Sequence, residues 1–148
     1  MNLILKNIKK SERKTFNNLA KNYYIELNKN FKATTIWKNK KLLILINDKS
    51  KIIKWICFNN EKIGFLILNK VLNPFTKQKK IIIQDYFIIK KYRRKKFGVK
   101  TFAKIKKFAK KNKFKLIEVE TLLKNKKAHE FWRKLKFKPM SIMSKCTI

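Results

Sequence analysis

The chain has 148 residues, of which 45% are hydrophobic and 13% aromatic. This composition excludes a disordered chain, and the length predicts a single globular domain, 1–148, whose core is large enough to fold without disulfides. The unusual quantity is the formal net charge of +33, which comes from 41 Lys and Arg against 8 Asp and Glu.

The basic residues are mostly lysine, since only four are arginine: Arg13, Arg93, Arg94 and Arg133. Lys, Asn and Ile, which A/T-rich codons specify, fill nearly half of the chain. A biased genome is therefore the simplest explanation of the charge. Proteins that recognise phosphates or bases tend to use the planar arginine fork. A basic nucleic-acid-binding or ribosome-associated protein remains the alternative hypothesis.

Two cysteines, Cys57 and Cys146, stand far apart in the sequence. This spacing is not typical of a disulfide framework and favours a reducing compartment. The apolar segment 2–5 is too short for the core of a signal peptide, and no uncharged run is long enough to cross a bilayer. We expect a cytoplasmic protein without a membrane partner.

The N-terminal part of the chain predicts a strand followed by two helices. Residues 3–8 are expected to form the strand, and Ser11 with Glu12 is typical of a helix start. The first helix places apolar residues on one face: Phe16, Leu19, Tyr23 and Leu27. Residues 34–47 favour a second helix, although the apolar run 42–46 is also compatible with a strand.

The middle of the chain has the pattern of strands. Residues 52–58 and 63–68, joined by a short polar turn, predict a hairpin. The β-branched run 81–89 predicts a central strand. The basic segment 90–96 then leads to Gly98 and to an amphipathic helix.

The C-terminal part predicts a strand at 113–123, a helix at 128–135 and a final strand from Phe137 onward. The order of elements predicts a mixed α/β sheet with helices on both of its faces. The most informative segment is 81–111, which runs from the strand through the basic loop and Gly98 into the helix, because the N-terminus of a helix offers unpaired N–H groups and a positive dipole end. A basic loop that enters such a terminus predicts a phosphate site, and an ordinary turn with solvated lysines is the alternative.

Two motifs in the right order resemble the GNAT superfamily of acyl-CoA N-acyltransferases. The segment 92–98 is similar to the family's Arg/Gln-x-x-Gly-x-Gly/Ala, and the segment 125–137 is similar to Asn-x-x-Ala-x-x-Phe-Tyr-x-x-x-Gly-Phe. The resemblance is strongest over about 61–139. It implies a twisted, mostly antiparallel mixed α/β sheet of roughly six to seven strands with helices on both faces.

The resemblance implies transfer of an acetyl group from acetyl-CoA to a primary amine, by direct attack in a ternary complex and without a metal. The amine is expected to belong to a small molecule or a protein, and the chain is expected to act as a monomer or a homodimer. Within this family pattern the backbone of Ile88 and the side chain of Asn125 would contact pantetheine, while 93–98 would hold the pyrophosphate. The implied CoA-binding residues are Ile88, Arg93, Arg94, Lys95, Lys96, Phe97, Gly98 and Asn125.

The sequence departs from the family pattern at three positions. Lys96 replaces the first motif glycine, Lys136 replaces the glycine near the end of the last helix, and Trp132 replaces the usual tyrosine. That tyrosine often protonates the leaving thiolate, whereas an indole N–H donates a hydrogen bond but is no practical acid. We expect Trp132 to shape the thioester pocket without transferring a proton.

The candidates for a general base are Asp85, Glu118 and Glu120, acting directly or through water. Glu118 and Glu120 alternate with apolar residues, so one solvent-facing side of a strand explains both equally well. The alternative hypothesis is a basic nucleic-acid-binding or ribosome-associated protein that keeps the fold without catalysis.

Overall fold

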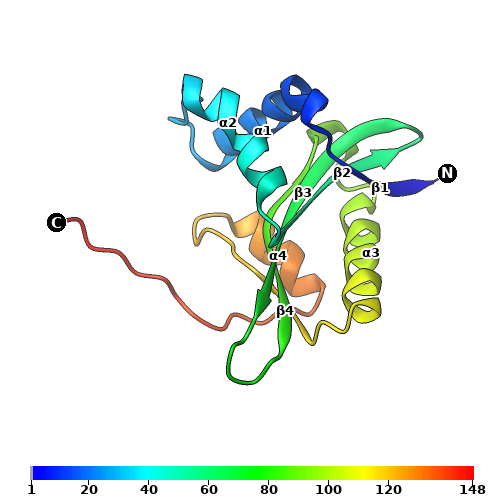
Figure 1. Ribbon diagram of the computed structural model, residues 1–148, viewed down its shortest axis with the longest axis vertical. Helices are drawn as coiled ribbons and strands as arrows, with labels where there is room; N and C mark the ends of the chain where they lie inside the picture. Colours follow the sequence, from blue (N-terminus) through cyan, green and yellow to red (C-terminus); the bar gives the residue numbers. More distant parts are fainter. Residues whose placement is uncertain (1) are drawn as a thin grey trace.

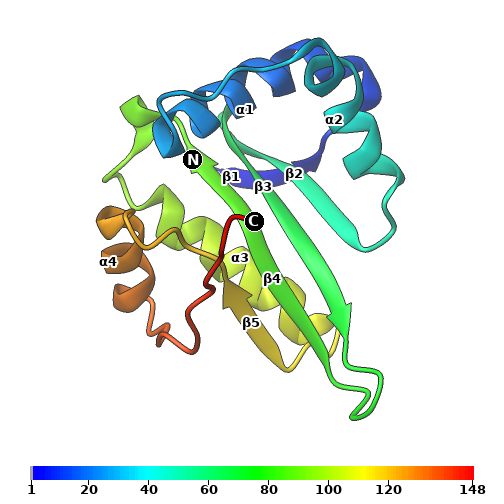
Figure 2. The same cartoon turned by 90° about the vertical axis from the view of Figure 1, so that its left-hand side faces the viewer.

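A five-stranded sheet in the order β1-β2-β3-β4-β5 separates two helical layers in the computed structural model, which describes residues 2–148 (Figures 1 and 2). The strands are β1 (Leu3–Asn7), β2 (Lys51–Phe58), β3 (Glu61–Leu72), β4 (Lys79–Ile88) and β5 (Leu116–Val119). The helices are α1 (Arg13–Leu27), α2 (Thr35–Asn47), α3 (Phe97–Lys111) and α4 (Lys126–Lys134), with 3-10 turns η1 (Lys10–Glu12) and η2 (Lys90–Tyr92). None of the helices described within 2–148 combines the length and apolarity needed to cross a membrane.

The predicted mixed sheet with helices on both faces is confirmed, and so is helix rather than strand for most of 34–47. The hydroxyl oxygen of Thr34 caps α2 by accepting a hydrogen bond from the backbone N–H of Trp37 at 3.1 Å. Ser11 is not a cap, because it lies inside η1 and α1 begins at Arg13. The hairpin turn has Asn59 and Asn60 at φ of 47° and 66°, a left-handed pair that suits the twist of a two-residue turn.

The predicted strand from Phe137 is wrong, and the sheet has five strands instead of six to seven. The described segment after Phe137 is exposed and runs outward from the sheet (Figure 1). Pro139 lacks the N–H that a strand would contribute to the ladder. The predicted strand at 113–123 is shorter in the structure, Leu116–Val119. The alternation of apolar and polar residues continues beyond Val119, but hydrogen-bonded pairing with the neighbouring strand stops there.

That neighbour is β4, whose two edges are paired unequally. It is antiparallel to β3 along its whole length, whereas β5 runs parallel to it only from Lys80 to Ile83. The last link is a hydrogen bond of 3.4 Å from the backbone N–H of Glu120 to the carbonyl of Ile83. The register with β3 also shifts at this point, where Gln84 is an extra residue of β4 without a partner on β3. Beyond Ile83 the edge of β4 toward β5 is therefore open.

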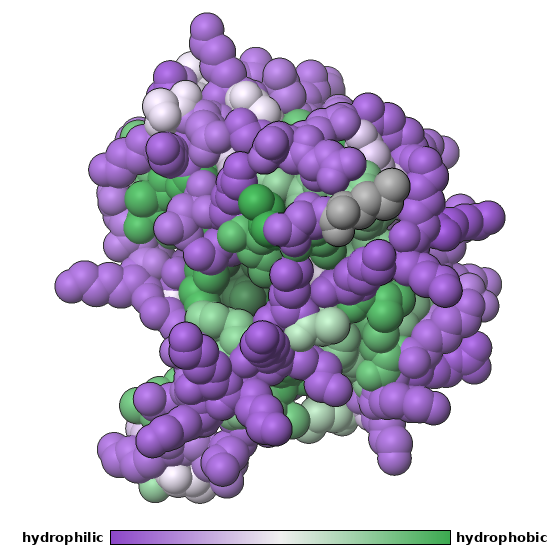
Figure 3. Space-filling model, turned by 90° about the vertical axis from the view of Figure 1, so that its right-hand side faces the viewer, coloured by the Kyte–Doolittle hydropathy of each residue, from purple (hydrophilic) through white to green (hydrophobic). Residues whose placement is uncertain are grey.

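Each face of the sheet has its own hydrophobic core. The α1/α2 face is rich in aromatic side chains and includes Phe16, Leu42, Trp55, Phe65 and Phe87. The α3/α4 face includes Ile81, Ile83, Phe102, Ile105 and Trp132. The outer surface of α3 carries lysines, and the side of the molecule where α3 lies is mostly hydrophilic (Figure 3).

Candidate active site

The open edge of β4 ends at the basic loop, and the loop ends at the N-terminus of α3. Arg94 and Lys96 adopt left-handed backbone conformations, with φ of 60° and 63°. Lys96 is the N-cap of α3, and no side chain within the described range 2–148 caps this helix. Its first N–H groups therefore remain available to an anion. Lys95 and Lys96 are exposed beside them.

The loop needs no glycine at Lys96 to make its turn, because the lysine itself takes the left-handed conformation. Such a conformation is strained for a residue with a Cβ. Gly98 serves packing instead, since a Cβ there would lie 3.1 Å from the ring of Phe131 on α4. Its carbonyl accepts a hydrogen bond of 2.6 Å from the hydroxyl of Tyr86 on β4. Phe97 is buried in the α3/α4 core.

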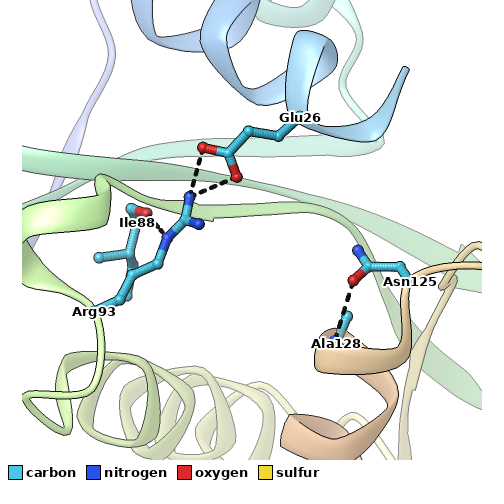
Figure 4. Close-up of polar contacts among 5 residues, drawn as sticks. All are labelled: Glu26, Ile88, Arg93, Asn125 and Ala128. Carbon is cyan, nitrogen blue, oxygen red and sulfur yellow. Dashed lines mark hydrogen bonds and ion pairs between the residues drawn. The ribbon is translucent and has the colours of Figure 1, made fainter. Parts of the chain in front are cut away.

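Arg93 points across β4 toward α1 (Figure 4). Its Nε donates a hydrogen bond of 2.6 Å to the carbonyl of Ile88, and its Nη2 pairs with both carboxylate oxygens of Glu26 at 2.8 and 2.9 Å. Arg93 therefore links the end of β4 to the last turn of α1. Ile88 itself is buried, and its carbonyl keeps a second lone pair for another donor.

Asn125 lies across from Arg93 at the start of α4 (Figure 4). Its Oδ1 accepts a hydrogen bond of 3.2 Å from the backbone N–H of Ala128 and so caps the helix. The amide nitrogen of the same side chain is a separate donor group. The capping bond fixes the orientation in which that donor is presented.

Among the acids proposed as bases, Asp85 has the most enclosed surroundings. It lies two residues beyond Ile83, on the α1/α2 side of β4, and its Oδ2 accepts a hydrogen bond of 2.7 Å from the hydroxyl of Tyr24. Burial and the negative charge of Asp85 both raise the pKa of that tyrosine hydroxyl, so it stays a donor. The same two causes raise the pKa of Tyr23.

Glu118 and Glu120 occupy different surroundings from Asp85. Glu118 forms an ion pair of 3.0 Å with Lys80 on the neighbouring strand. Glu120 is exposed just beyond the end of β5. Of the two, only Glu120 lies beyond the paired part of the sheet. No cluster of three or more His, Cys, Asp or Glu side chains within 2–148 is arranged to hold a metal ion.

Trp132 is 6% exposed and lies inside a cluster of aromatic rings. Its ring centroid is 4.8 Å from that of Phe131, 5.2 Å from Phe137, 5.3 Å from Tyr86 and 6.0 Å from Phe102. These contacts join α4 to α3 and to β4. They give the indole a packing role that accounts for its size.

Three residues of this region were not predicted from the sequence: Glu26, Tyr24 and Lys41. The ε-amine of Lys41 lies 4.8 Å from the ring centroid of Tyr24, and the residue is half-buried. Glu26 could have been singled out from the sequence, because acids are scarce in this chain and a carboxylate among so many lysines is expected to form an ion pair. Tyr24 and Lys41 gave no such signal, since the packing of α1 against α2 is what brings them to β4.

The sequence between 13 and 137 matches the model of the acetyltransferase (GNAT) family. The chain belongs to this family. No curated protein matches it significantly.

Solved structures with the same fold cover nearly the whole chain. A possible acetyltransferase from Clostridium difficile 630 has a TM-score of 0.81 at 14% identity, covering 100% of this chain and 99% of its own. An aminoglycoside acetyltransferase from an uncultured soil metagenomic sample, in complex with sisomicin, has a TM-score of 0.78 at 16% identity, covering 99% and 96%. Ribosomal-protein-alanine N-acetyltransferase from Brucella melitensis biovar Abortus 2308 has a TM-score of 0.72 at 11% identity, covering 99% and 97%. At these identities the likeness shows the fold alone.

Proposed function

We propose that this GNAT-family protein transfers an acetyl group from acetyl-CoA to a primary amine of a small molecule or a protein, by direct attack in a ternary complex. The observation that carries the proposal is the unpaired edge of β4 beyond Ile83, which leads directly to the uncapped N-terminus of α3. An extended pantetheine arm can pair with such an edge as an added strand would, while the helix N-terminus takes the phosphates.

Each part of CoA has a matching partner in this arrangement. The N–H groups at the start of α3, with the charges of Arg94, Lys95 and Lys96, suit the pyrophosphate. The second lone pair of the Ile88 carbonyl and the amide nitrogen of Asn125 suit the amide groups of pantetheine. Lys96 adds charge where a glycine would offer only backbone.

The acetyl group then lies near Asp85, because pantetheine would run back along β4 from Ile88. A strand advances by about 3.3 Å per residue, so three residues span roughly 10 Å. Asp85 would accept a proton from the incoming ammonium group, with Tyr24 fixing the orientation of the carboxylate. The neutral amine attacks the thioester carbonyl, the C–N bond forms, the nitrogen gives up a second proton to water and the C–S bond breaks. The thiolate takes a proton from water, since Trp132 is packed in the core and does not supply one.

The first experiment measures thermal unfolding with and without acetyl-CoA. A ligand that binds only the folded protein at about a hundred times its Kd adds roughly 2.7 kcal/mol to the free energy of unfolding. We expect acetyl-CoA to raise the melting temperature at low salt and also at high salt. Double-stranded DNA is the control, because binding driven by phosphate contacts alone weakens steeply as salt increases.

The second experiment measures release of the CoA thiol against a panel of amines that includes aminoglycosides and peptides with an N-terminal alanine. Asp85→Asn is expected to lower turnover while leaving acetyl-CoA affinity nearly unchanged, because the carboxylate acts on the amine. If acetyl-CoA leaves the melting temperature unchanged and DNA raises it, the catalytic proposal is wrong and the binding hypothesis replaces it.

A further inference from the structure

Lys41 differs from the other lysines of α2 in where its amine lies. Lys38 and Lys40 are exposed, whereas Lys41 is half-buried and its ε-amine sits over the ring of Tyr24, 4.8 Å from the centroid. The hydroxyl of the same tyrosine donates to Asp85. An amine, a tyrosine and a carboxylate from three different elements, α2, α1 and β4, are thus gathered beside the open edge of the sheet.

The surroundings favour the nucleophilic form of this amine. Burial lowers the pKa of Lys41, and the negative charge of Asp85 only partly offsets that effect. A larger fraction of Lys41 is therefore neutral than of a solvated lysine at the same pH. A neutral lysine amine is the species that attacks an acyl group.

The position also matches the expected place of the thioester. Asp85 lies just beyond the last β4–β5 pair, on the α1/α2 side of the sheet, and Lys41 is held on that same side. The amine of an external acceptor would have to approach this carboxylate. Lys41 carries such an amine already.

We propose that Lys41 is a self-acetylation site of this protein. The inference rests on the proposed function, because the acetyl donor is acetyl-CoA bound along β4. The ε-amine of Lys41 attacks the thioester carbonyl carbon, an N–C bond forms, the C–S bond breaks, and CoA leaves as a thiolate. Asp85 takes the proton lost by the amine. The acetylated side chain has lost its positive charge and fills the space that an external amine would use.

The test measures acetylation of the three neighbouring lysines within a single peptide. The purified full chain is incubated with acetyl-CoA, and the chymotryptic peptide that follows Trp37 is analysed by fragment-ion mass spectrometry, which separates Lys38, Lys40 and Lys41. The two exposed lysines report ordinary chemical acetylation. We expect Lys41 to be acetylated at least tenfold faster, at a rate that saturates with acetyl-CoA, and we expect Asp85→Asn to slow it.

Two comparisons distinguish acetylation of Lys41 by acetyl-CoA bound to the protein from nonspecific reactivity of its amine. S-acetyl-N-acetylcysteamine carries the same thioester without the nucleotide, and excess desulfo-CoA competes for the CoA site without donating an acetyl group. Selective labelling that requires acetyl-CoA and is blocked by desulfo-CoA supports the proposal. Labelling of Lys41 no faster than of Lys38 and Lys40 overturns it, and so does equal labelling by the short thioester.

The same samples distinguish this inference from the proposed function. A rise in melting temperature with acetyl-CoA but no preference for Lys41 rejects self-acetylation and leaves the proposed function standing. No rise in melting temperature rejects both. Lys41→Arg keeps a cation over the ring of Tyr24 and cannot form the acetyl-lysine, so its mass spectrum checks the assignment of the modified residue.

Discussion

The two halves of β4 differ in their pairing and in their chemistry. From Lys79 to Ile83 the strand has neighbours on both edges and is a run of isoleucines after two lysines. From Gln84 to Ile88 it has no neighbour on the β5 edge; this half includes Asp85 and Tyr86, and it pairs with β3 from Asp85 onward. The backbone N–H and C=O groups of the paired half are hydrogen-bonded within the sheet, whereas some of these groups in the open half remain available to a ligand. One strand thus combines a structural segment with a binding segment.

The comparison predicts that substitutions in the paired half affect stability and leave ligand binding intact. Ile83 is fully buried in the α3/α4 core, so Ile83→Ala is expected to lower the free energy of unfolding by about 3 kcal/mol. Chemical denaturation measures the loss. Ile82→Ala is the matched control, because the neighbouring side chain is only half-buried and should cost less.

Acetyl-CoA affinity of Ile83→Ala, measured by titration at a temperature where the variant is folded, should stay close to that of the wild type. A large loss of affinity there would mean that the two halves do not act independently.

The next largest expected effect is on CoA binding by the basic loop that follows the open half of β4. Lys96→Glu places a negative charge at the N-terminus of α3, and we expect at least tenfold weaker CoA binding, or about 1.4 kcal/mol. Lys96→Gly should bind CoA nearly as well as the wild type. It should also gain up to about 1 kcal/mol of stability, because glycine relieves the left-handed strain. Equal CoA affinities for wild type and Lys96→Glu would place the phosphate site elsewhere.

A smaller effect is expected where α4 supports the open half. Trp132 packs against Tyr86, so Trp132→Phe should cost roughly 1 kcal/mol of stability and keep most of the turnover at saturating acetyl-CoA. Denaturation and thiol-release kinetics measure the two quantities separately. If turnover disappears while CoA affinity and melting temperature are intact, the indole N–H takes part in the reaction and the packing role is insufficient.

The elements of the fold were predictable wherever side-chain periodicity and burial agree. The apolar stripe of Val99, Phe102, Ile105 and Ala109 predicts α3, and the last three are buried on one face, whereas Val99 in the first turn is exposed. The segment after Phe137 was not predictable, since a strand depends on a neighbouring strand and the sequence does not state whether one is present. The same limit applies to β5, because its alternation of apolar and polar residues continues beyond the last residue that pairs with β4.

The candidate site was predictable only as far as local sequence determines it. The basic loop and Gly98 mark the start of α3, because strand, loop and helix are contiguous. The neighbours of Asp85 were not predictable, since Tyr24 and Lys41 reach it through the packing of α1 and α2 over β4. The partner of Arg93 was missed for the same reason, because Glu26 is 67 residues away in the sequence.

The smallest expected effect tests that long-range pair. Both side chains of the Arg93–Glu26 ion pair are more than a third exposed, so the pair contributes at most about 1 kcal/mol to stability. Its larger consequence is electrostatic, because Glu26 neutralises the first arginine of a loop that should bind an anion. Glu26→Gln removes this negative charge, and we expect CoA affinity to rise about threefold at low salt, with a smaller rise at high salt. Titration calorimetry measures both values.

Glu61→Gln provides the matched control, because Glu61 forms a similar exposed ion pair at 2.9 Å with Lys91, which lies in η2, two residues before Arg93. Both substitutions remove one negative charge, so a nonspecific change in net charge would raise affinity equally in the two variants. A rise confined to Glu26→Gln would show that Arg93 is released toward the phosphates. A fall in affinity would contradict this expectation and assign Glu26 the opposite role, in which its contact with Arg93 holds the end of β4 in the conformation that receives CoA.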